Sequence, residues 1–426
     1  MRQGLTMKRT IDDLKITAVE EGNTLSEEIQ QTFDLDSRDI HEITGLDKVY
    51  SFTGVVCRGD SILISFPKHY ISIKEFNNFS TYEKIQHIRL ILKTIIEYET
   101  NPEFSDYTNA EDFNPIFSFK AFYDIVNYYQ QFGLYHRNRK ILKKNSTGKI
   151  SWKTTLTKSQ KILSNGNLIF TPLFKKQTAW TEDFITRCMV FAINYTEELF
   201  GLIMELPDNS SIVGRGIDEN IRNNYTFVIF QLQMLLSQTF KDLNKQLINS
   251  LISFFQGLNH NNRIVRDIKD YHFNNIWERA VEKYLNDHFA GVENETLKFL
   301  NQGTIGPFTK ITLSAYNEAH PSHKLEPDHY YYDVQSQTQY IFDSKYYHKL
   351  NSLNFKQVVY HMLMANRAVH TYDALILPYE FKTKTGKHLE LSKNYLIDSE
   401  HPITILVTHL NTNKVLKNFV SQTDKK

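Results

Sequence analysis

Short apolar runs and helical repeats of apolar residues divide the N-terminal part of the chain into elements. Two β-prone runs within residues 49–67 flank the turn signal Arg58-Gly59-Asp60, which predicts a β-hairpin. Residues 81–99 repeat apolar positions every three or four residues, which predicts a helix. Ser80 and Glu83 fit a capping box at the start of that helix. Residues 11–48 are polar and acidic, and we expect a short helical lead-in or a partly ordered arm there.

The middle of the chain is predicted to be helical. Apolar and aromatic residues favour helices over 117–132, 182–205 and 218–258, and Gly133 suits the end of the first. The C-terminal part mixes element types. A helix around Trp277 is followed by a strand-and-turn region at 309–345, a second helix at 354–368, and strands at 373–377 and 403–407. Strands that alternate with helices indicate a mixed α/β, or α+β, fold.

Length and composition set the number of domains and the class of protein. A chain of 426 residues suggests two or three domains, and 41% hydrophobic residues are enough for a buried core. The net charge of +1 provides no global attraction to nucleic acid, so any basic surface must be local. Cys57 and Cys188 are too few for a zinc site of paired cysteines and favour a reducing compartment. We see no signal peptide and no membrane-spanning run, and expect a soluble protein.

The strongest chemical signal lies in the predicted hairpin of the C-terminal part. Asp328 precedes one β-prone run, and Asp343 ends the next, after a turn at residues 335–338. The two aspartates should therefore lie close together, and Lys345 should point to the same side as Asp343 because side chains alternate along a strand. Two carboxylates can hold a hard cation such as Mg²⁺ through oxygen. With a lysine to orient or deprotonate water and to stabilise charge, this arrangement suits phosphodiester hydrolysis.

An isolated Asp-x-Lys on a strand is more often a solvated edge. Here the apolar residues on both sides of Asp343 indicate an interior strand, where charges need partners or a metal. Glu278 lies near the apolar face of the helix around Trp277, and Gln357 and Tyr360 share a face of the helix after the Asp343 strand. An ordinary surface glutamate, and residues that only cap and pack, remain the alternatives for these three.

These features together resemble the PD-(D/E)XK nucleases. That family places a glutamate on a helix, Pro-Asp before a strand, an acid-x-Lys on the next strand, and Gln-x-x-Tyr on a following helix. Here the pattern runs from about residue 274 to 365, with Asp343 at the second acidic position and Ser344 as the variable residue. The resemblance implies catalytic Glu278, Asp328, Asp343 and Lys345, support from Gln357 and Tyr360, and metal ligation by Asp328, Asp343 and Glu278. It implies Mg²⁺ as cofactor, with Mn²⁺ as a substitute.

A narrower resemblance covers roughly residues 50–365. Phe273-Asn-Asn-Ile-Trp-Glu, Gly148-Lys-Ile-Ser-Trp-Lys-Thr-Thr-Leu, and Phe52-Thr-Gly-Val-Val with Ser65-Phe-Pro-Lys68 are similar to segments of LlaJI-type restriction endonucleases, relatives of the McrC nuclease subunit. The resemblance implies a bacterial cytoplasmic nuclease subunit of an antiviral restriction system. It also implies double-stranded DNA as substrate, an McrB-like AAA+ GTPase or ATPase as partner, and dimerisation of nuclease domains as a further expectation.

A basic segment precedes the nuclease-like part. Residues 136–161 contain nine Lys or Arg and no Asp or Glu. The segment can be read as a DNA-contacting loop or as a solvated hairpin. By the family resemblance it can also be the surface that contacts the AAA+ partner, where Arg137, Arg139 or a nearby Lys would act on the partner's nucleotide. The predicted contact residues are Arg137, Arg139, Lys140, Lys143, Lys144, Lys149 and Trp152. The sequence contains no P-loop motif, so we expect this chain to bind no nucleotide itself.

The predicted organisation is a helix-rich N-terminal domain with a β-hairpin at 1–115, a helical middle domain at 116–262 and a PD-(D/E)XK endonuclease domain at 263–426. The predicted function is DNA cleavage as a subunit activated by a separate NTPase. A stand-alone restriction or repair nuclease, a nuclease that cuts RNA, and a non-catalytic DNA-binding module remain open as alternatives.

Overall fold

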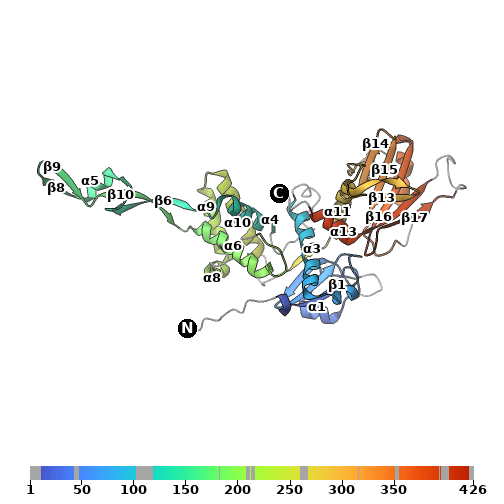
Figure 1. Cartoon of the computed structure of the whole chain (residues 1–426), viewed down its shortest axis with the longest axis horizontal. Helices are drawn as coiled ribbons and strands as arrows, with labels where there is room; N and C mark the ends of the chain where they lie inside the picture. The colour runs from blue at the N-terminus through green and yellow to red at the C-terminus, as the bar shows by residue number, and fades with distance from the viewer. Residues whose placement is uncertain are drawn as a thin grey trace. The chain divides into compact units, whose positions relative to one another are not determined.

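Figure 1 shows the computed structural model of the chain. The structure describes residues 11–42, 48–101, 119–181, 183–207, 212, 216–259, 267–314, 316–350, 355–392, 394 and 403–421. The chain forms two compact units. Unit 1 comprises residues 1–117, 202–205 and 263–426, and unit 2 comprises residues 118–201 and 206–262. The N-terminal and C-terminal parts of the sequence thus share unit 1.

The N-terminal part of unit 1 is built on a four-stranded sheet with the order β1-β5-β4-β11. The predicted hairpin is confirmed as β4 (Thr53–Arg58) and β5 (Ser61–Phe66), which pair antiparallel. β1 (Lys15–Glu20) runs parallel to β5, and β11 (Ile268–Asp270) pairs with β4. A strand from far along the sequence therefore completes this sheet.

The expectation of a helical lead-in or arm before residue 48 is wrong for most of that segment. β1 is a strand because β5 supplies its hydrogen-bond partners and because Val19 packs against Phe52 and Leu63 in the core. The described remainder holds a short 3-10 helix and three small elements: η1 (Ile11–Asp13), α1 (Glu27–Phe33), β2 (Ile40–Glu42) and β3 (Lys48–Tyr50).

The predicted helix after the hairpin is confirmed as α3 (Thr81–Thr100). Its capping box forms as expected, with the Ser80 hydroxyl accepting from the Glu83 N–H and the Glu83 carboxylate accepting from the Ser80 N–H. The apolar stripe of the helix, including Ile88 and Ile95, is buried. A short helix, α2 (Ile73–Asn77), precedes α3. The C-terminal helix α13 (Thr412–Val420) packs against α3.

The C-terminal part of unit 1 contains a five-stranded sheet with the order β14-β15-β16-β18-β17. β15 runs antiparallel to β14 and parallel to β16, β18 continues parallel, and β17 closes the far edge antiparallel. The bounds are β14 (His329–Asp333), β15 (Thr338–Ser344), β16 (His370–Tyr379), β17 (Lys384–Glu390) and β18 (Thr404–Asn411). The mixed α/β class is confirmed; β17 and α13 had not been predicted.

Helices and aromatic residues cover the two faces of this sheet. On one face Ile341 packs with Tyr360 and Met364 of α12 (Phe355–Met364). On the other, the Phe342 ring lies against Phe289 and Phe308. Asp343 therefore shares the face that α12 covers, because residues i and i+2 point the same way. The remaining elements are α11 (Phe273–His288), β12 (Phe289–Glu293), β13 (Thr296–Phe299) and η3 (Ala365–Arg367).

Unit 2 combines helices with a long β-ribbon. Its helices are α4 (Phe119–Phe132), α6 (Phe184–Phe200), α8 (Glu219–Arg222), α9 (Tyr225–Ser237) and α10 (Asp242–Asn259). The prediction of one helix over 218–258 is wrong, because the segment breaks twice. At the first break the Asn224 side chain accepts from the Phe227 N–H and starts a new helix.

The basic segment belongs to the ribbon of unit 2, which we call the arm and define as residues 137–181. β6 (Arg137–Lys144) and β10 (Phe174–Thr181) pair antiparallel along the ribbon (Figure 1). One end of the ribbon leads into α4 and α6. The other end carries the remaining elements: β7 (Lys149–Ile150), α5 (Trp152–Lys158) and the β8–β9 hairpin (Gln160–Ser164 and Asn167–Thr171).

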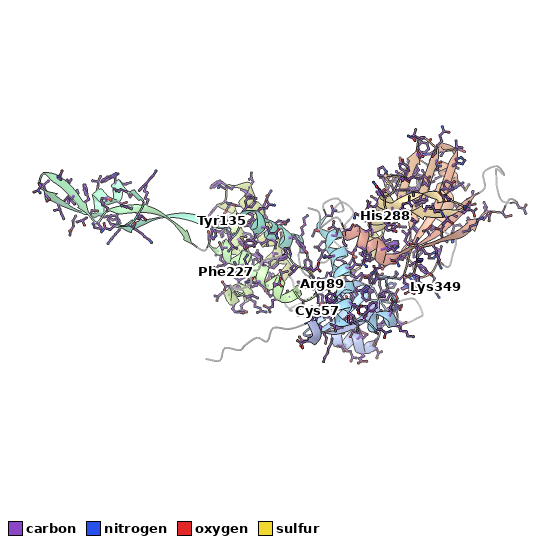
Figure 2. All side chains as sticks on the ribbon, in the orientation of Figure 1. Cys57, Arg89, Tyr135, Phe227, His288 and Lys349 are labelled. Carbon is purple, nitrogen blue, oxygen red and sulfur yellow. The ribbon has the colours of Figure 1, made fainter. Side chains whose placement is uncertain are left out.

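The two cysteines are buried thiols in different units, Cys57 on β4 (Figure 2) and Cys188 on α6. In the part of the chain that the structure describes, every helix is too short or too polar to cross a membrane.

Candidate active site

The β14–β15 hairpin brings the two predicted aspartates together. His329 pairs with Phe342, so the next position outward sets Asp328 beside Asp343. The Ser344 N–H donates to Asp328 Oδ2 at 3.0 Å, and the His329 Nε2 atom lies 2.7 Å from the Ser344 hydroxyl oxygen. These two contacts fasten the start of β14 to the end of β15. The predicted proximity of the aspartates is thus confirmed.

Asp343 is the most unusual group of the site. Its side chain is only 1% exposed, and the Lys345 ammonium contacts its Oδ2 atom. Apart from that ammonium, no described residue supplies a hydrogen bond to either carboxylate oxygen of Asp343. A buried carboxylate that lacks hydrogen-bond donors is costly unless a cation compensates it. The Lys345 ammonium compensates Oδ2, and Oδ1 is therefore the oxygen best suited to a further positively charged ligand.

The nearby charges shift the pKa values of Asp328 and Lys345. Burial, and then repulsion from Asp343 and Glu278, raise the pKa of Asp328 to about 8. Burial alone would lower the pKa of Lys345, but attraction to Asp343 and Asp328 outweighs it and raises that pKa. Lys345 is therefore a firmly protonated ammonium here. A divalent cation bound at this point would relieve the repulsion that Asp328 experiences from Asp343 and Glu278.

Glu278 reaches the site from α11, where Trp277 and Val281 are buried on the packed face of the helix. Its Oε1 accepts from the Lys310 ammonium at 3.0 Å, and the same ammonium lies 3.8 Å from Asp328 Oδ1. Lys310 thus joins Glu278 to Asp328. The predicted glutamate shares a charge cluster with the aspartates and is not an isolated surface residue.

Lys310 was missed by the sequence analysis, and no local pattern marks it among 49 Lys and Arg residues. Its place depends on a long-range pairing: Thr309 and Tyr330 exchange backbone hydrogen bonds of 3.0 and 2.9 Å, which lays residue 310 beside the start of β14. His329 was missed too. Burial, and then the nearby cations Arg279, Lys310 and Lys345, lower the pKa of His329 to about 3, so it is a neutral residue that holds Ser344.

Gln357 and Tyr360 lie behind the aspartates on α12. The Gln357 amide Nε2 donates to the Ile341 carbonyl at 2.8 Å and to Asp373 at 3.2 Å, so it ties α12 to β15 and β16. Tyr360 is buried against Ile341. Burial, and then repulsion from Asp343 and Asp328, raise the pKa of its hydroxyl. Both residues support the strand that carries Asp343.

The fit of a metal ion depends on what these residues offer. Among the described residues, no group of three or more His, Cys, Asp or Glu side chains is arranged to hold a metal ion. Lysine ammonium groups lie against the carboxylates instead, Lys310 at Glu278 and Lys345 at Asp343. The oxygen donors, the burial and the charge nevertheless suit Mg²⁺, and Asp343 in particular has few competing partners.

The arm residues predicted for contact fall into two groups. Lys143, Lys144, Lys149 and Trp152 are exposed, whereas the side chains of Arg137, Arg139 and Lys140 lie outside the described part of the structure. From Arg137 to Thr181 the chain has eleven Lys or Arg and no acid. The β8–β9 hairpin adds exposed apolar side chains, with Leu163 76% and Leu168 54% exposed. The arm is therefore a basic and partly apolar surface.

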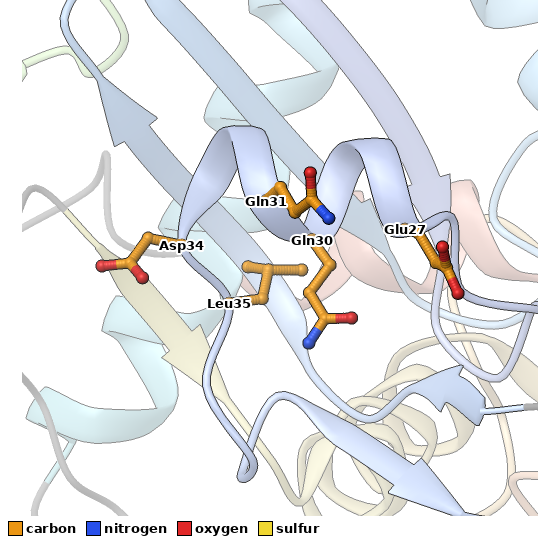
Figure 3. Close-up of a pocket in the computed structure, with 5 residues that line it drawn as sticks. All are labelled: Glu27, Gln30, Gln31, Asp34 and Leu35. Atoms are coloured by element: carbon orange, nitrogen blue, oxygen red, sulfur yellow. The ribbon is translucent and has the colours of Figure 1, made fainter.

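A separate pocket lies beside α1 in the N-terminal part of unit 1. Figure 3 shows its lining, which consists of Glu27, Gln30, Gln31, Asp34 and Leu35. Two carboxylates without a cation in the lining repel a phosphate group. This pocket is therefore unsuited to the chemistry of the Asp328–Asp343 site.

The end of the β14–β15 hairpin thus gathers two adjacent aspartates and Lys345, and Lys310 joins Glu278 to them. The chain belongs to the LlaJI restriction endonuclease family, whose family model matches residues 52–363. The resemblance predicted from the sequence motifs is thus confirmed, and membership implies endonuclease activity in a restriction system.

One similar solved structure is described as a refined half-complex from the tetradecameric assembly of Thermococcus gammatolerans McrB AAA+ hexamers with bound McrC. The alignment covers 96% of this chain and 100% of that chain, with 12% identity and a TM-score of 0.40. A likeness at that level is too weak to carry an inference. No curated protein matches the chain.

Proposed function

We propose that this chain is the metal-dependent endonuclease subunit of an McrBC-like restriction system and cuts double-stranded DNA. In this proposal the five-stranded sheet with α11 and α12 forms a PD-(D/E)XK core. The observation that carries it is the buried Asp343 carboxylate beside Asp328, with Lys345 in contact. Family membership supports endonuclease activity.

Mg²⁺, or Mn²⁺ in its place, would be held by Asp328 and Asp343, with Glu278 as a third acidic ligand once Lys310 releases it. The ion would supply Lewis acidity and a water of lowered pKa. Asp328 and Asp343 occupy paired positions at the end of the β14–β15 hairpin, where contacts of Ser344 and His329 join the two strands, which supports a shared role in holding the ion. Binding of the ion would require the Lys345 ammonium to leave Asp343 and the Lys310 ammonium to leave Glu278.

Lys345 and Lys310 would stabilise negative charge on the phosphate. The raised pKa of Lys345 favours a protonated ammonium over a general base. Of the roles predicted from the sequence, this favours stabilisation of charge over deprotonation of the attacking water. Lys310 is half-buried between Glu278 and Asp328, and attraction to these carboxylates outweighs burial and raises its pKa as well. A phosphate could take over both ammonium groups as the carboxylates take up the metal.

The arm is proposed as the surface that contacts a ring-shaped AAA+ partner. The arm has exposed lysines, a sequence without Asp or Glu from residue 137 to 181, and exposed Leu163 and Leu168, which fit a partner surface that is partly anionic and partly apolar. DNA alone does not account for the apolar side chains of β8 and β9, which favours a protein surface. Because the sequence lacks a P-loop, nucleotide hydrolysis would belong to that partner.

The proposed activity is tested by incubating the full chain with duplex DNA and, in parallel, with RNA of the same sequence. We expect cleavage of DNA that requires Mg²⁺ or Mn²⁺ and stops in EDTA, because the carboxylates need a cation to bind a phosphate. The assay is run with and without an AAA+ protein encoded beside this gene. Cleavage of RNA alone would contradict the DNA assignment, and cleavage in EDTA would contradict the metal-dependent mechanism.

A further inference from the structure

Tyr346, the residue after Lys345, is held by the N-terminal sheet. Its side chain is buried, and its hydroxyl donates to Glu21 Oε2 at 2.8 Å and accepts from the Lys68 N–H at 2.9 Å. Glu21 follows β1, and Lys68 follows β5. The N-terminal part of unit 1 thus contacts the C-terminal part at Tyr346, the residue directly after the candidate catalytic lysine.

Glu21 is the centre of this contact. Its Oε2 also accepts from the Thr53 hydroxyl at 2.9 Å, and its Oε1 lies 3.4 Å from the Lys68 ammonium. That ammonium stands 4.6 Å from the centre of the Tyr346 ring. A charged acceptor with several donors makes stronger and better directed bonds than a neutral pair. The tyrosine is therefore fixed by both its hydroxyl and its ring.

His348 provides a second attachment of the same segment. Its Nε2 atom lies 2.8 Å from the Glu21 carbonyl oxygen, and its own carbonyl oxygen lies 2.8 Å from His69 Nε2. Gly22 leaves the space for this approach, since a Cβ atom there would lie 2.4 Å from His348 Nε2. Residues 346–348 are thus held at both ends against the sheet.

The Tyr346 ring also faces α11. Its centre is 5.7 Å from that of Phe273, the first residue of the helix that carries Glu278. Thr53 and Lys68 lie in the two hairpin motifs singled out in the sequence, and Phe273 opens the third. Three of the segments that the sequence analysis linked only through the family resemblance therefore meet around Tyr346 and its partner Glu21.

We infer that Glu21, Lys68 and Tyr346 form an anchor through which the N-terminal sheet positions Lys345. Lys345 lies just beyond the end of β15, where its N–H donates to the Ile376 carbonyl at 2.8 Å. That bond holds the residue on one side, and the anchor holds it on the other. A lysine has a long flexible side chain, so a fixed backbone is what keeps its ammonium at the carboxylates.

This inference rests on the proposed function, because it assigns Tyr346 as a positioning residue for that site. It means that the N-terminal sheet is part of the nuclease and is more than a separate binding domain. Tyr346 itself touches neither of the aspartates in any contact that the structure describes. Its effect should therefore appear in the rate of the chemical step and leave the affinity for DNA unchanged.

The test is Tyr346→Phe in the full chain, assayed on duplex DNA with Mg²⁺ and any activating partner. This change keeps the ring against Phe273 and Lys68 and removes only the hydroxyl. We expect kcat to fall roughly 10- to 100-fold, since a misplacement on the order of 1 Å costs that much, with KM for DNA unchanged. Glu21→Gln should cause a similar loss, and the double variant should lose little more than either single one.

Tyr82→Phe is the matched control, because Tyr82 is 63% exposed at the start of α3. Hydrogen exchange measured by mass spectrometry gives a readout independent of activity: peptides covering residues 344–350 should exchange faster in Tyr346→Phe and unchanged in Tyr82→Phe. Wild-type kcat or unchanged exchange in a folded Tyr346→Phe protein would overturn the anchor. Failure of the wild-type chain to cut DNA would instead overturn the proposed function.

Discussion

Asp343→Ala should abolish DNA cleavage and leave the protein folded. A bound metal ion contributes several kcal/mol to phosphodiester hydrolysis, and about 1.4 kcal/mol is a factor of ten. Loss of a ligand should therefore lower the rate by roughly 100-fold or more. The free energy of unfolding of the metal-free protein should stay within about 1 kcal/mol of wild type or rise slightly, because Asp328 loses a like charge and can pair with Lys345.

The comparison needs a matched carboxylate. Glu293→Ala removes a carboxylate that is 75% exposed at the end of β12, and it should change neither cleavage nor stability. Cleavage is measured under single-turnover conditions and unfolding by thermal denaturation. Full activity of Asp343→Ala would refute the active site, while a collapse of stability would mean that Asp343 serves mainly as a structural ion-pair partner of Lys345.

The second large effect should come from the partner. We expect the isolated chain to cut DNA poorly, and a P-loop AAA+ protein encoded beside it to switch cleavage on only with hydrolysable nucleotide. The partner's NTPase rate should rise when this chain is added. Asp343→Ala should raise that rate as well as wild type does, because the arm and the candidate site lie in different units.

The role of the arm in that activation is tested by charge reversal. Lys143→Glu with Lys144→Glu should reduce NTPase stimulation about tenfold or more, since electrostatic steering changes association by 10- to 1000-fold. Lys120→Glu with Lys241→Glu reverses two exposed lysines of unit 2 outside the arm and should have little effect. Equal stimulation by both double variants would show that the arm is a solvated hairpin. Robust nucleotide-independent cutting by the chain alone would point to a stand-alone nuclease.

Local patterns predicted those elements whose stability is mostly local. Helix α3 has a sharp apolar repeat and a capping box, and the β14–β15 hairpin has two β-prone runs around a short turn. The juxtaposition of Asp328 and Asp343 followed from that hairpin. The catalytic roles of these residues and of Glu278, Lys345, Gln357 and Tyr360 remain predictions, since geometry alone does not measure rate.

Features that depend on distant pairing could not be predicted in the same way. β1 lies within a polar and acidic stretch of sequence, and it forms a strand because β5 pairs with it. Lys310 reaches the site because Thr309 pairs with Tyr330, and β11 joins β4 across the whole of unit 2's sequence. The anchor likewise joins Glu21 and Lys68 to Tyr346, whose ring also contacts Phe273, and the wide separation of these residues in the chain hides their contact. One sequence contains no signal for such encounters.

The most direct test of the central claim is the anomalous difference density of crystals grown with Mn²⁺. The account predicts a Mn²⁺ peak bound by carboxylate oxygens of Asp328 and Asp343, absent from crystals of Asp343→Ala grown under the same conditions. An ion bound elsewhere, with the Asp343–Lys345 contact retained at saturating Mn²⁺, would contradict the assignment of this hairpin as the catalytic metal site.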